Sequence, residues 1–202
     1  MANKIAPHGF APLRYLNGAA WNGATNVYLV PSTDGSVISV GDAVKSAAGG
    51  DANGISAVAK AAGTDTVRGV VVGVLAVNPN DPSLVGTNLD LTLQNIPATK
   101  TKDYYVMVVD DPAVVFSLED DGVGGLSAAA ACNKNAIFVV ANPVAPSQVS
   151  ATTLSTASIA TTSTLNLKLL GLVQAPDNAY GVNADWAVMF NLHELRGSTA
   201  GV

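Results

Sequence analysis

Short apolar runs separated by turn-forming residues follow one another along most of the chain. The runs are rich in β-branched and aromatic residues, and stretches such as STDG, NPNDP and APDN divide them. This pattern predicts about ten short β-strands and no long helix. The predicted strands cover residues 27–30, 37–40, 56–61, 67–77, 89–93, 104–109, 114–118, 136–141, 165–173 and 186–193. We therefore expect an all-β fold, a β-sandwich or barrel with a jelly-roll-like arrangement.

Other local patterns refine this expectation. LDLTLQ, at 89–94, alternates apolar and polar residues, which predicts one face in solvent. VVVGVLAV, at 70–77, has no polar side, so we expect burial on both faces or contact with a partner. The repeated AAGGD at 47–51 and AAGTD at 61–65 predict two turns, because Gly adopts positive φ and Asp hydrogen-bonds its own backbone two residues on. A short helix is predicted for LSAAAACNK, at 126–134.

Residues 1–25 combine closely spaced Pro and Gly with three aromatic residues, Phe10, Tyr15 and Trp21. Pro and Gly at this density prevent a regular helix, while aromatic residues are rare in disordered tails. We interpret the segment as an extended N-terminal arm that docks its rings either on a partner or on its own domain. Residues 26–202 then form a single β-rich domain, since a chain of 202 residues has little room for two large ones.

Residues 135–167 contain no charged side chain, and a Ser/Thr-rich uncharged segment lies at about 142–164. The β-branched threonines allow this segment to form edge strands. An uncharged edge invites aggregation unless something covers it. We expect a neighbouring subunit to cover it, which would make the segment an assembly surface.

Charged residues make up only 12% of the chain, against an average of about 25%. Ser, Thr, Asn, Gly and Ala must therefore cover much of the surface, as suits a protein packed against copies of itself or other partners. The net charge is −5, and the 10 Lys and Arg residues are scattered, so we expect no direct nucleic-acid binding. The longest apolar run, 69–77, is too short to cross a membrane. The N-terminus lacks the apolar core of a secretion signal, and we expect synthesis in a cytoplasm.

Residues that usually carry catalysis or bind metals are few. His8, His193 and Cys132 are the only His and Cys residues, and their spacing fits no zinc site. We expect His193 to be a buried structural histidine. The sequence has neither a G-x-S-x-G motif nor a phosphate-binding glycine loop. We therefore expect no enzyme, no catalytic residue, no metal and no cofactor.

Carboxylates cluster as Asp110 and Asp111, and as Glu119, Asp120 and Asp121, on either side of one short predicted strand. Paired acids are able to bind Ca²⁺ or to act as acid and base in a glycosidase. Their spacing fits no EF-hand loop, and Asp-Pro and Asp-Gly are common in turns. We therefore expect solvated turns that lie too far apart to act together, with a divalent ion site as the alternative.

Three longer stretches are SVGDAVKSAAGGDANGISAVAKA, DYYVMVVDDPAVVFSLEDDG and LNLKLLGLVQAPDNAYGVNADWAVMFNLHEL. Together they resemble the capsid cement, or decoration, proteins of tailed bacteriophages, over roughly residues 36–195. The resemblance implies a β-rich structural virion protein on the capsid exterior that bridges neighbouring subunits of the major capsid protein and stabilises the icosahedral shell. It implies other copies of the chain as further partners, and it carries over no catalytic residue.

On this interpretation, Phe10, Tyr15 and Trp21, together with the uncharged residues 135–167, contact the partner subunits. Deleting residues 1–25 should then abolish shell binding and leave the β-core folded. One alternative is a β-sandwich glycan-binding module, lectin-like or from a tail fibre, with aromatic residues beside carboxylates or Ca²⁺. A β-sandwich hydrolase that uses the two acidic clusters is another alternative. A major capsid protein is a further one, although the chain lacks the long helical spine that resemblance to that family would require.

Overall fold

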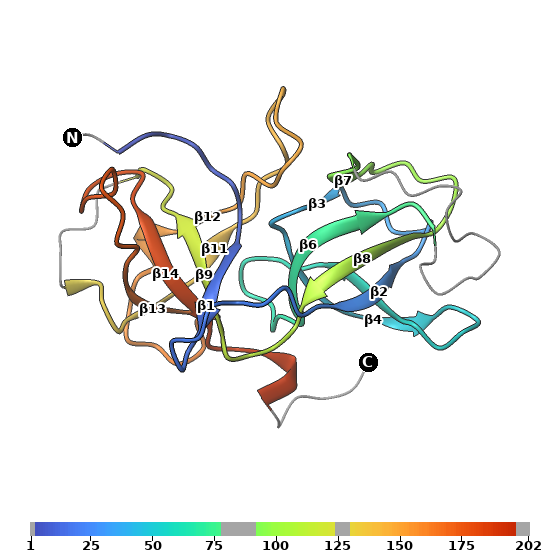
Figure 1. Ribbon diagram of the computed structural model, residues 1–202, viewed down its shortest axis with the longest axis horizontal. Coiled ribbons are helices and arrows are strands. Elements are labelled where there is room, and N and C mark those ends of the chain that lie inside the picture. Colours follow the sequence, from blue (N-terminus) through green and yellow to red (C-terminus); the bar gives the residue numbers. More distant parts are fainter. Residues whose placement is uncertain (1–2, 78–91, 124–129, 197–202) are drawn as a thin grey trace.

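Two β units lie side by side in the computed structural model, one a closed barrel and the other a five-stranded sheet (Figure 1). The structure describes residues 3–77, 92–123 and 130–196. Strands form nearly all of its regular structure, with short 3-10 turns such as η2 (Thr156–Ser158) and η3 (Glu194–Arg196) between or after them. The expected all-β fold is confirmed.

The barrel is closed, because its first and last strands also pair with each other. Its order is β2-β5-β4-β6-β8, and its pairs are antiparallel except for the parallel pair β2 and β5. Alternate side chains of these Val-rich strands fill the interior, and closure leaves no free strand edge. The bounds are β2 (Asn26–Val30), β4 (Ala43–Gly50), β5 (Ser56–Lys60), β6 (Gly69–Leu75) and β8 (Tyr104–Val109). A small sheet of β3 (Ile38–Ser39) and β7 (Asn95–Ile96) packs its two isoleucines into the same core.

The second unit is an antiparallel sheet of order β1-β9-β14-β13-β10. Its strands are β1 (Ala11–Tyr15), β9 (Val114–Glu119), β10 (Asn135–Ala136), β13 (Leu167–Leu172) and β14 (Asp185–Phe190). The separate antiparallel pair β11 (Phe138–Val139) and β12 (Thr153–Leu154) packs against this sheet through Phe138 and Leu154. The Ser/Thr-rich segment therefore contributes one short strand, β12.

One apolar core joins the two units. It contains Phe116 and Trp186 from the sheet and also Val67, Val70 and Val109 from the barrel side. Burying these large side chains is the main favourable term in folding. The two units therefore share a core that neither completes alone.

Most predicted strands coincide with strands of the structure. The prediction for 104–109 matches β8. In the run 70–77, Val70, Val71 and Val74 are buried while the other residues are half-buried, so the expected burial on both faces holds only in part. Residues 89–91 of one predicted strand lie outside the described residues, and residues 92–93 form no strand. Residues 126–129 of the predicted helix also lie outside them, and residues 130–134 form no α-helix.

The first repeated turn lies later than predicted. Residues 47–50 continue β4, and the chain turns at Asp51. The Oδ1 atom of Asp51 accepts hydrogen bonds from the backbone N–H groups of Asn53 and Ile55, at 2.9 and 2.8 Å. The predicted role of the aspartate is confirmed, while the predicted position of the turn is wrong because Gly and Ala are compatible with the strand here.

The N-terminal residues do not form a free arm. β1 pairs with β9 as the edge strand of the sheet, and Phe10 is only 2% exposed within the shared core. Gly9 has a φ of 68°, and a Cβ atom there would lie 2.5 Å from the carbonyl oxygen of Gly41. The backbone N–H of Phe10 donates to that same oxygen at 2.8 Å. Of the two expected docking modes, the structure shows docking on the chain's own domain.

This docking corrects the expectation for deletion of residues 1–25. The deletion removes an edge strand and the buried ring of Phe10, so it destabilises the β-core instead of leaving it intact. It is therefore no clean test of partner binding.

Replacement of Phe10 tests its role in the core. Phe10→Ala should lower the free energy of unfolding by about 3–5 kcal/mol, because it leaves a cavity among buried rings. Leu13→Ala, on the same β1 and 39% exposed, is the matched control and should change it far less. Urea unfolding followed by tryptophan fluorescence measures both. Equal effects of the two replacements would contradict the assignment.

Candidate functional site

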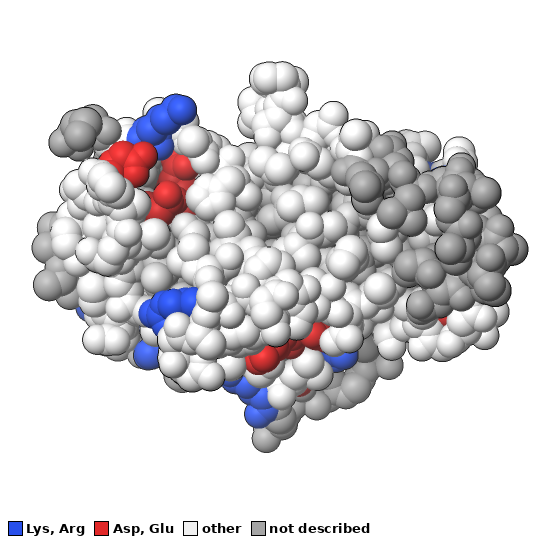
Figure 2. Space-filling view, viewed as in Figure 1, with Lys and Arg blue, Asp and Glu red and all other residues white. Residues whose placement is uncertain are grey.

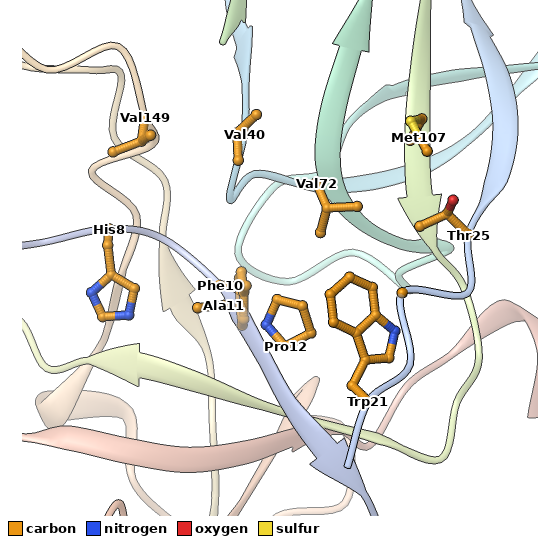
Figure 3. Close-up of a pocket in the computed structure, with 11 residues that line it drawn as sticks. His8, Phe10, Ala11, Pro12, Trp21, Thr25, Val40, Val72, Met107 and Val149 are labelled. Atoms are coloured by element: carbon orange, nitrogen blue, oxygen red, sulfur yellow. The ribbon is translucent and has the colours of Figure 1, made fainter. Parts of the chain in front are cut away.

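An apolar groove of about 440 Å³ lies between the N-terminal residues and the barrel (Figure 3). Pro12 and Trp21 form one part of its wall, and Val72 and Met107 of the barrel strands face them. The indole Nε1 of Trp21 is buried and has no hydrogen-bond partner among the described residues. The lining of the groove is mostly apolar, so the groove can accept an apolar group.

The three aromatic residues predicted to bind a partner differ in their positions. Trp21 lines the groove, and Phe10 contributes to its wall although its ring belongs to the core. Tyr15 lines a separate, open depression with Leu16 and donates a hydrogen bond from its hydroxyl to Oδ1 of Asn22, at 2.9 Å. Phe10 is therefore corrected to a core residue, whereas partner contacts by Tyr15 and Trp21 stay a prediction.

A loop of residues 140–149 projects from the molecule between β11 and β12, and it is the orange loop at the top of Figure 1. We call it the projecting loop. It carries no charged residue, and Val144 within it is 69% exposed. Val149 at its base also lines the apolar groove. The projecting loop and the groove thus share Val149 and form one surface that contains no Lys, Arg, Asp or Glu.

Charged side chains occupy few places on the face drawn in Figure 2, and the projecting loop is free of them. One reason is that several charged residues lie inside the protein. Lys60 and Asp42 form a buried ion pair at 2.9 Å. The Nζ atom of Lys100 donates to the carbonyl oxygen of Ser36 at 2.8 Å with its side chain fully buried.

The acidic clusters are largely buried, which corrects the expectation of solvated turns. The carboxylate of Asp120 accepts three backbone N–H groups, from Gly122, Asn183 and Ala184, at 2.7–3.1 Å. The carboxylate of Asp110 accepts a hydrogen bond from the hydroxyl of Tyr28 at 2.6 Å. The prediction failed because Asn183, Ala184 and Tyr28 lie far along the chain from these aspartates and leave no local sequence signal.

Asp111 behaves as the turn chemistry predicts. It is exposed, and its Oδ1 atom accepts the backbone N–H of Ala113 at 2.8 Å. Asp110 and Asp111 precede β9, while Glu119 ends it and Asp120 follows. The two acidic clusters therefore lie at opposite ends of one strand, as expected.

His193 is buried beside the ring of Phe190. Its Nδ1 atom accepts the backbone N–H of Leu195 at 3.1 Å, which agrees with the expected structural histidine. Burial lowers the pKa of His193 to about 4, and the positive charge of Arg196 acts in the same direction. At neutral pH its imidazole is therefore uncharged.

A cluster that sequence reasoning missed brings His8, Glu119 and Asp185 together. These residues are 111 and 66 positions apart along the chain, so no motif spacing joins them. The only available signal was the Glu within the acidic cluster, which the turn interpretation assigned to solvent.

Comparisons with known proteins give no further assignment. No protein-family model, no curated protein and no solved structure matches the chain. Within the described ranges, no helix is long and apolar enough to cross a membrane.

The buried His193 predicts a pH dependence of stability. Its folded pKa of about 4 lies below the ordinary value of 6.5, so the unfolded chain takes up a proton first as the pH falls. The stability that neutral His193 contributes is complete above about pH 6.5 and is lost between about pH 6.5 and 4.

The comparison with His193→Asn isolates this contribution, because the Asn oxygen can still accept the N–H of Leu195. Urea unfolding at pH 4.5 and 7.5 should show a larger loss at low pH for the wild type than for the variant. Parallel pH curves would contradict the assignment.

Proposed function

We propose that this chain is a structural virion protein, a capsid cement protein that binds the outer face of an icosahedral phage head. Here it bridges neighbouring subunits of the major capsid protein and stabilises the shell. The proposal joins the sequence resemblance to one structural observation, the shared surface of projecting loop and groove that contains no Lys, Arg, Asp or Glu.

The chemistry of this surface suits contact with a protein. Exposed valines on the projecting loop lose little hydration when a partner covers them, whereas charged groups would have to be desolvated. Trp21, which lines the same groove as Val149 at the loop base, supplies the kind of aromatic side chain that often dominates interface energies. Many such modest contacts, repeated over a shell, give strong overall attachment.

The acidic clusters do not favour the hydrolase alternative. Asp110 and Asp120 lie at opposite ends of β9, and both carboxylates accept hydrogen bonds from within the fold. Retaining or inverting glycosidases instead need two acids flanking one bond. The net charge of −5 also suits the outside of a shell better than a surface that faces DNA.

The test is gradient sedimentation of assembled shells mixed with the purified chain, followed by counting of bound copies. The wild type should travel with the shells at a fixed ratio to the shell subunit. Val144→Asp should reduce binding at least about tenfold, since a buried unpaired charge costs more than 1.4 kcal/mol.

Leu195→Asp is the control, because Leu195 is exposed to 46% and η3 lies at the opposite side of the molecule in Figure 1. It should bind like the wild type. No co-sedimentation of the wild type would overturn the cement role and direct attention to glycan binding. Full binding by Val144→Asp would instead remove the projecting loop from the interface.

A further inference from the structure

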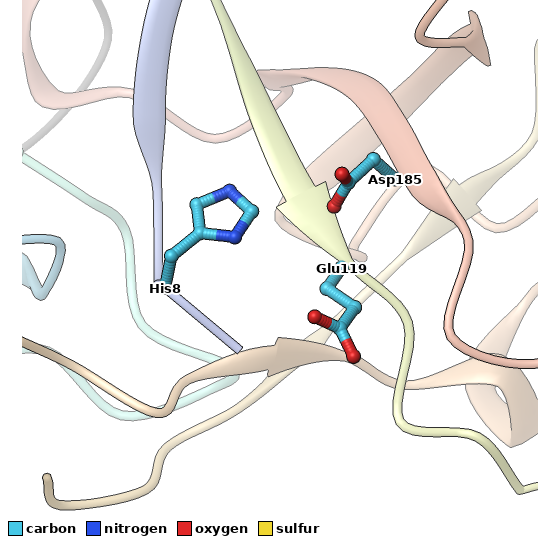
Figure 4. Close-up of side chains that lie close together, drawn as sticks. All are labelled: His8, Glu119 and Asp185. Atoms are coloured by element: carbon cyan, nitrogen blue, oxygen red, sulfur yellow. The ribbon is translucent and has the colours of Figure 1, made fainter. Parts of the chain in front are cut away.

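The cluster of His8, Glu119 and Asp185 lies where the N-terminal residues cross the ends of two sheet strands (Figure 4). Asp185 at the start of β14 pairs directly with Glu119 at the end of β9. Two carboxylates opposite each other on neighbouring strands repel. The fold therefore places like charges together, which costs stability unless a cation or a proton neutralises them.

Among the described residues, no Lys, Arg or His nitrogen lies within 4.0 Å of either carboxylate, although Lys4 and His8 line the same cavity. Glu119 is only 3% exposed, and both its oxygens contact a single donor, the backbone N–H of Ala6, at 3.0 and 3.3 Å. The Oδ1 atom of Asp185 is buried and accepts no hydrogen bond there. Buried carboxylates normally have such partners, so these two lack part of their compensation.

The hydrogen bond of His8 leaves one ring nitrogen without a proton. Its Nδ1 atom lies 3.3 Å from the carbonyl oxygen of Ala6, and since a carbonyl only accepts, Nδ1 carries the proton in this contact. The lone pair of Nε2 is then available, in the tautomer that metal-binding histidines commonly adopt. Ala6 thus contacts two members of the cluster, His8 through its carbonyl and Glu119 through its N–H.

The dimensions also suit a cation. One ligand atom from each of the three side chains lies within 4.8 Å of the other two, and a polar cavity of about 160 Å³ adjoins them. Ligand atoms of a tetrahedral Zn²⁺ lie roughly 3.5 Å apart, given bonds of about 2.0–2.2 Å. Side-chain shifts of about an ångström would close the site, and the cavity has room for water as a further ligand.

We propose that His8, Glu119 and Asp185 bind one divalent metal cation of the Zn²⁺ class. One imidazole nitrogen and two carboxylate oxygens form a ligand set that Zn²⁺ and similar transition metals accept, whereas Ca²⁺ and Mg²⁺ prefer oxygen alone. The cation neutralises the pair of opposed carboxylates and fastens the N-terminal segment to β9 and β14. The proposal is independent of the cement role.

Burial sets the electrostatics of the two carboxylates. It raises the pKa of Glu119 to about 7, and although the N–H of Ala6 opposes this shift, the charges of Asp185 and Asp120 add to it. Burial likewise raises the pKa of Asp185 above its ordinary value.

The experiment is calorimetric titration of the untagged, EDTA-treated full chain with Zn²⁺ at pH 7.5, together with thermal unfolding with and without the metal. The wild type should bind close to one Zn²⁺ per chain with a dissociation constant in the micromolar range or below, and the bound form should unfold at a higher temperature. Ca²⁺ should bind far more weakly.

Glu119→Gln and Asp185→Asn keep the side-chain shapes but remove one ligand charge each, and both should weaken Zn²⁺ binding at least about tenfold. His8→Gln should do the same. Glu119→Gln also removes a buried charge, so its metal-free form should be at least as stable as the wild type at pH 7.5 and folds well enough to be tested.

His193→Asn and Cys132→Ser are the matched controls, because they remove the chain's other histidine and its single cysteine outside the cluster. They should leave Zn²⁺ affinity unchanged. The proposal is overturned if the wild type binds no stoichiometric Zn²⁺, if Ca²⁺ binds more tightly, or if Glu119→Gln and Asp185→Asn bind like the wild type.

Discussion

The ring of Phe10 packs against Phe116, Phe138 and Phe190, with centroid distances of 5.1–6.1 Å. These partners come from β9, β11 and β14, while the backbone N–H of Phe10 bonds to Gly41 beside the barrel. Phe10 thus contacts the five-stranded sheet, the β11-β12 pair that packs on it, and the residues beside the barrel. The contacts with Phe116 and Phe138 are edge-to-face, a geometry that adds to the free energy of burial. The same anchor residue lines the apolar groove together with Pro12 and Trp21.

Several charged side chains of this fold are buried together with hydrogen-bonding or ionic partners. A chain with only 12% charged residues buries several of them, including Asp42, Lys60 and Asp120. Each of the three has partners inside the fold, and Asp120 accepts three backbone N–H groups. Because these charged side chains are buried, the surface carries fewer charges than the composition suggests. The cluster around Glu119 and Asp185 departs from this pattern, because Glu119 contacts a single donor and Oδ1 of Asp185 has no partner among the described residues.

The sequence predicted elements whose signal is local. The Val-rich run 104–109 coincides with β8, since continuous β-branched residues favour a buried strand wherever they lie. β1 was missed because Pro12 and the nearby glycines indicate irregular structure, although an edge strand tolerates proline. β4 was missed because Ala and Gly carry little strand propensity, and pairing with β5 and β6 decides its conformation.

The candidate sites depend on contacts between distant segments, which explains why so little of them was predicted. The wall of the groove joins Trp21 to Val72 and Met107, and the cation cluster joins three residues from both halves of the chain. An Asp-Asp doublet looks like a turn from its neighbours alone. Only the tertiary fold shows that Asp120 receives backbone donors more than sixty positions away. Because aspartate is common in solvated turns, its local sequence context predicted exposure to solvent for residues that the fold buries.

The base of the projecting loop has a mechanical consequence. The hydroxyl of Ser150 donates to Asp42 at 2.6 Å, and Lys60 of β5 contacts both Asp42 and the side chain of Asn142 within the loop. The loop is thereby attached at two points to a closed barrel whose strands all have neighbours on both sides. Tension applied to the loop would pass through a buried ion pair into the barrel backbone and spread over several strands. A loop anchored in this way also loses little conformational entropy when something grips it.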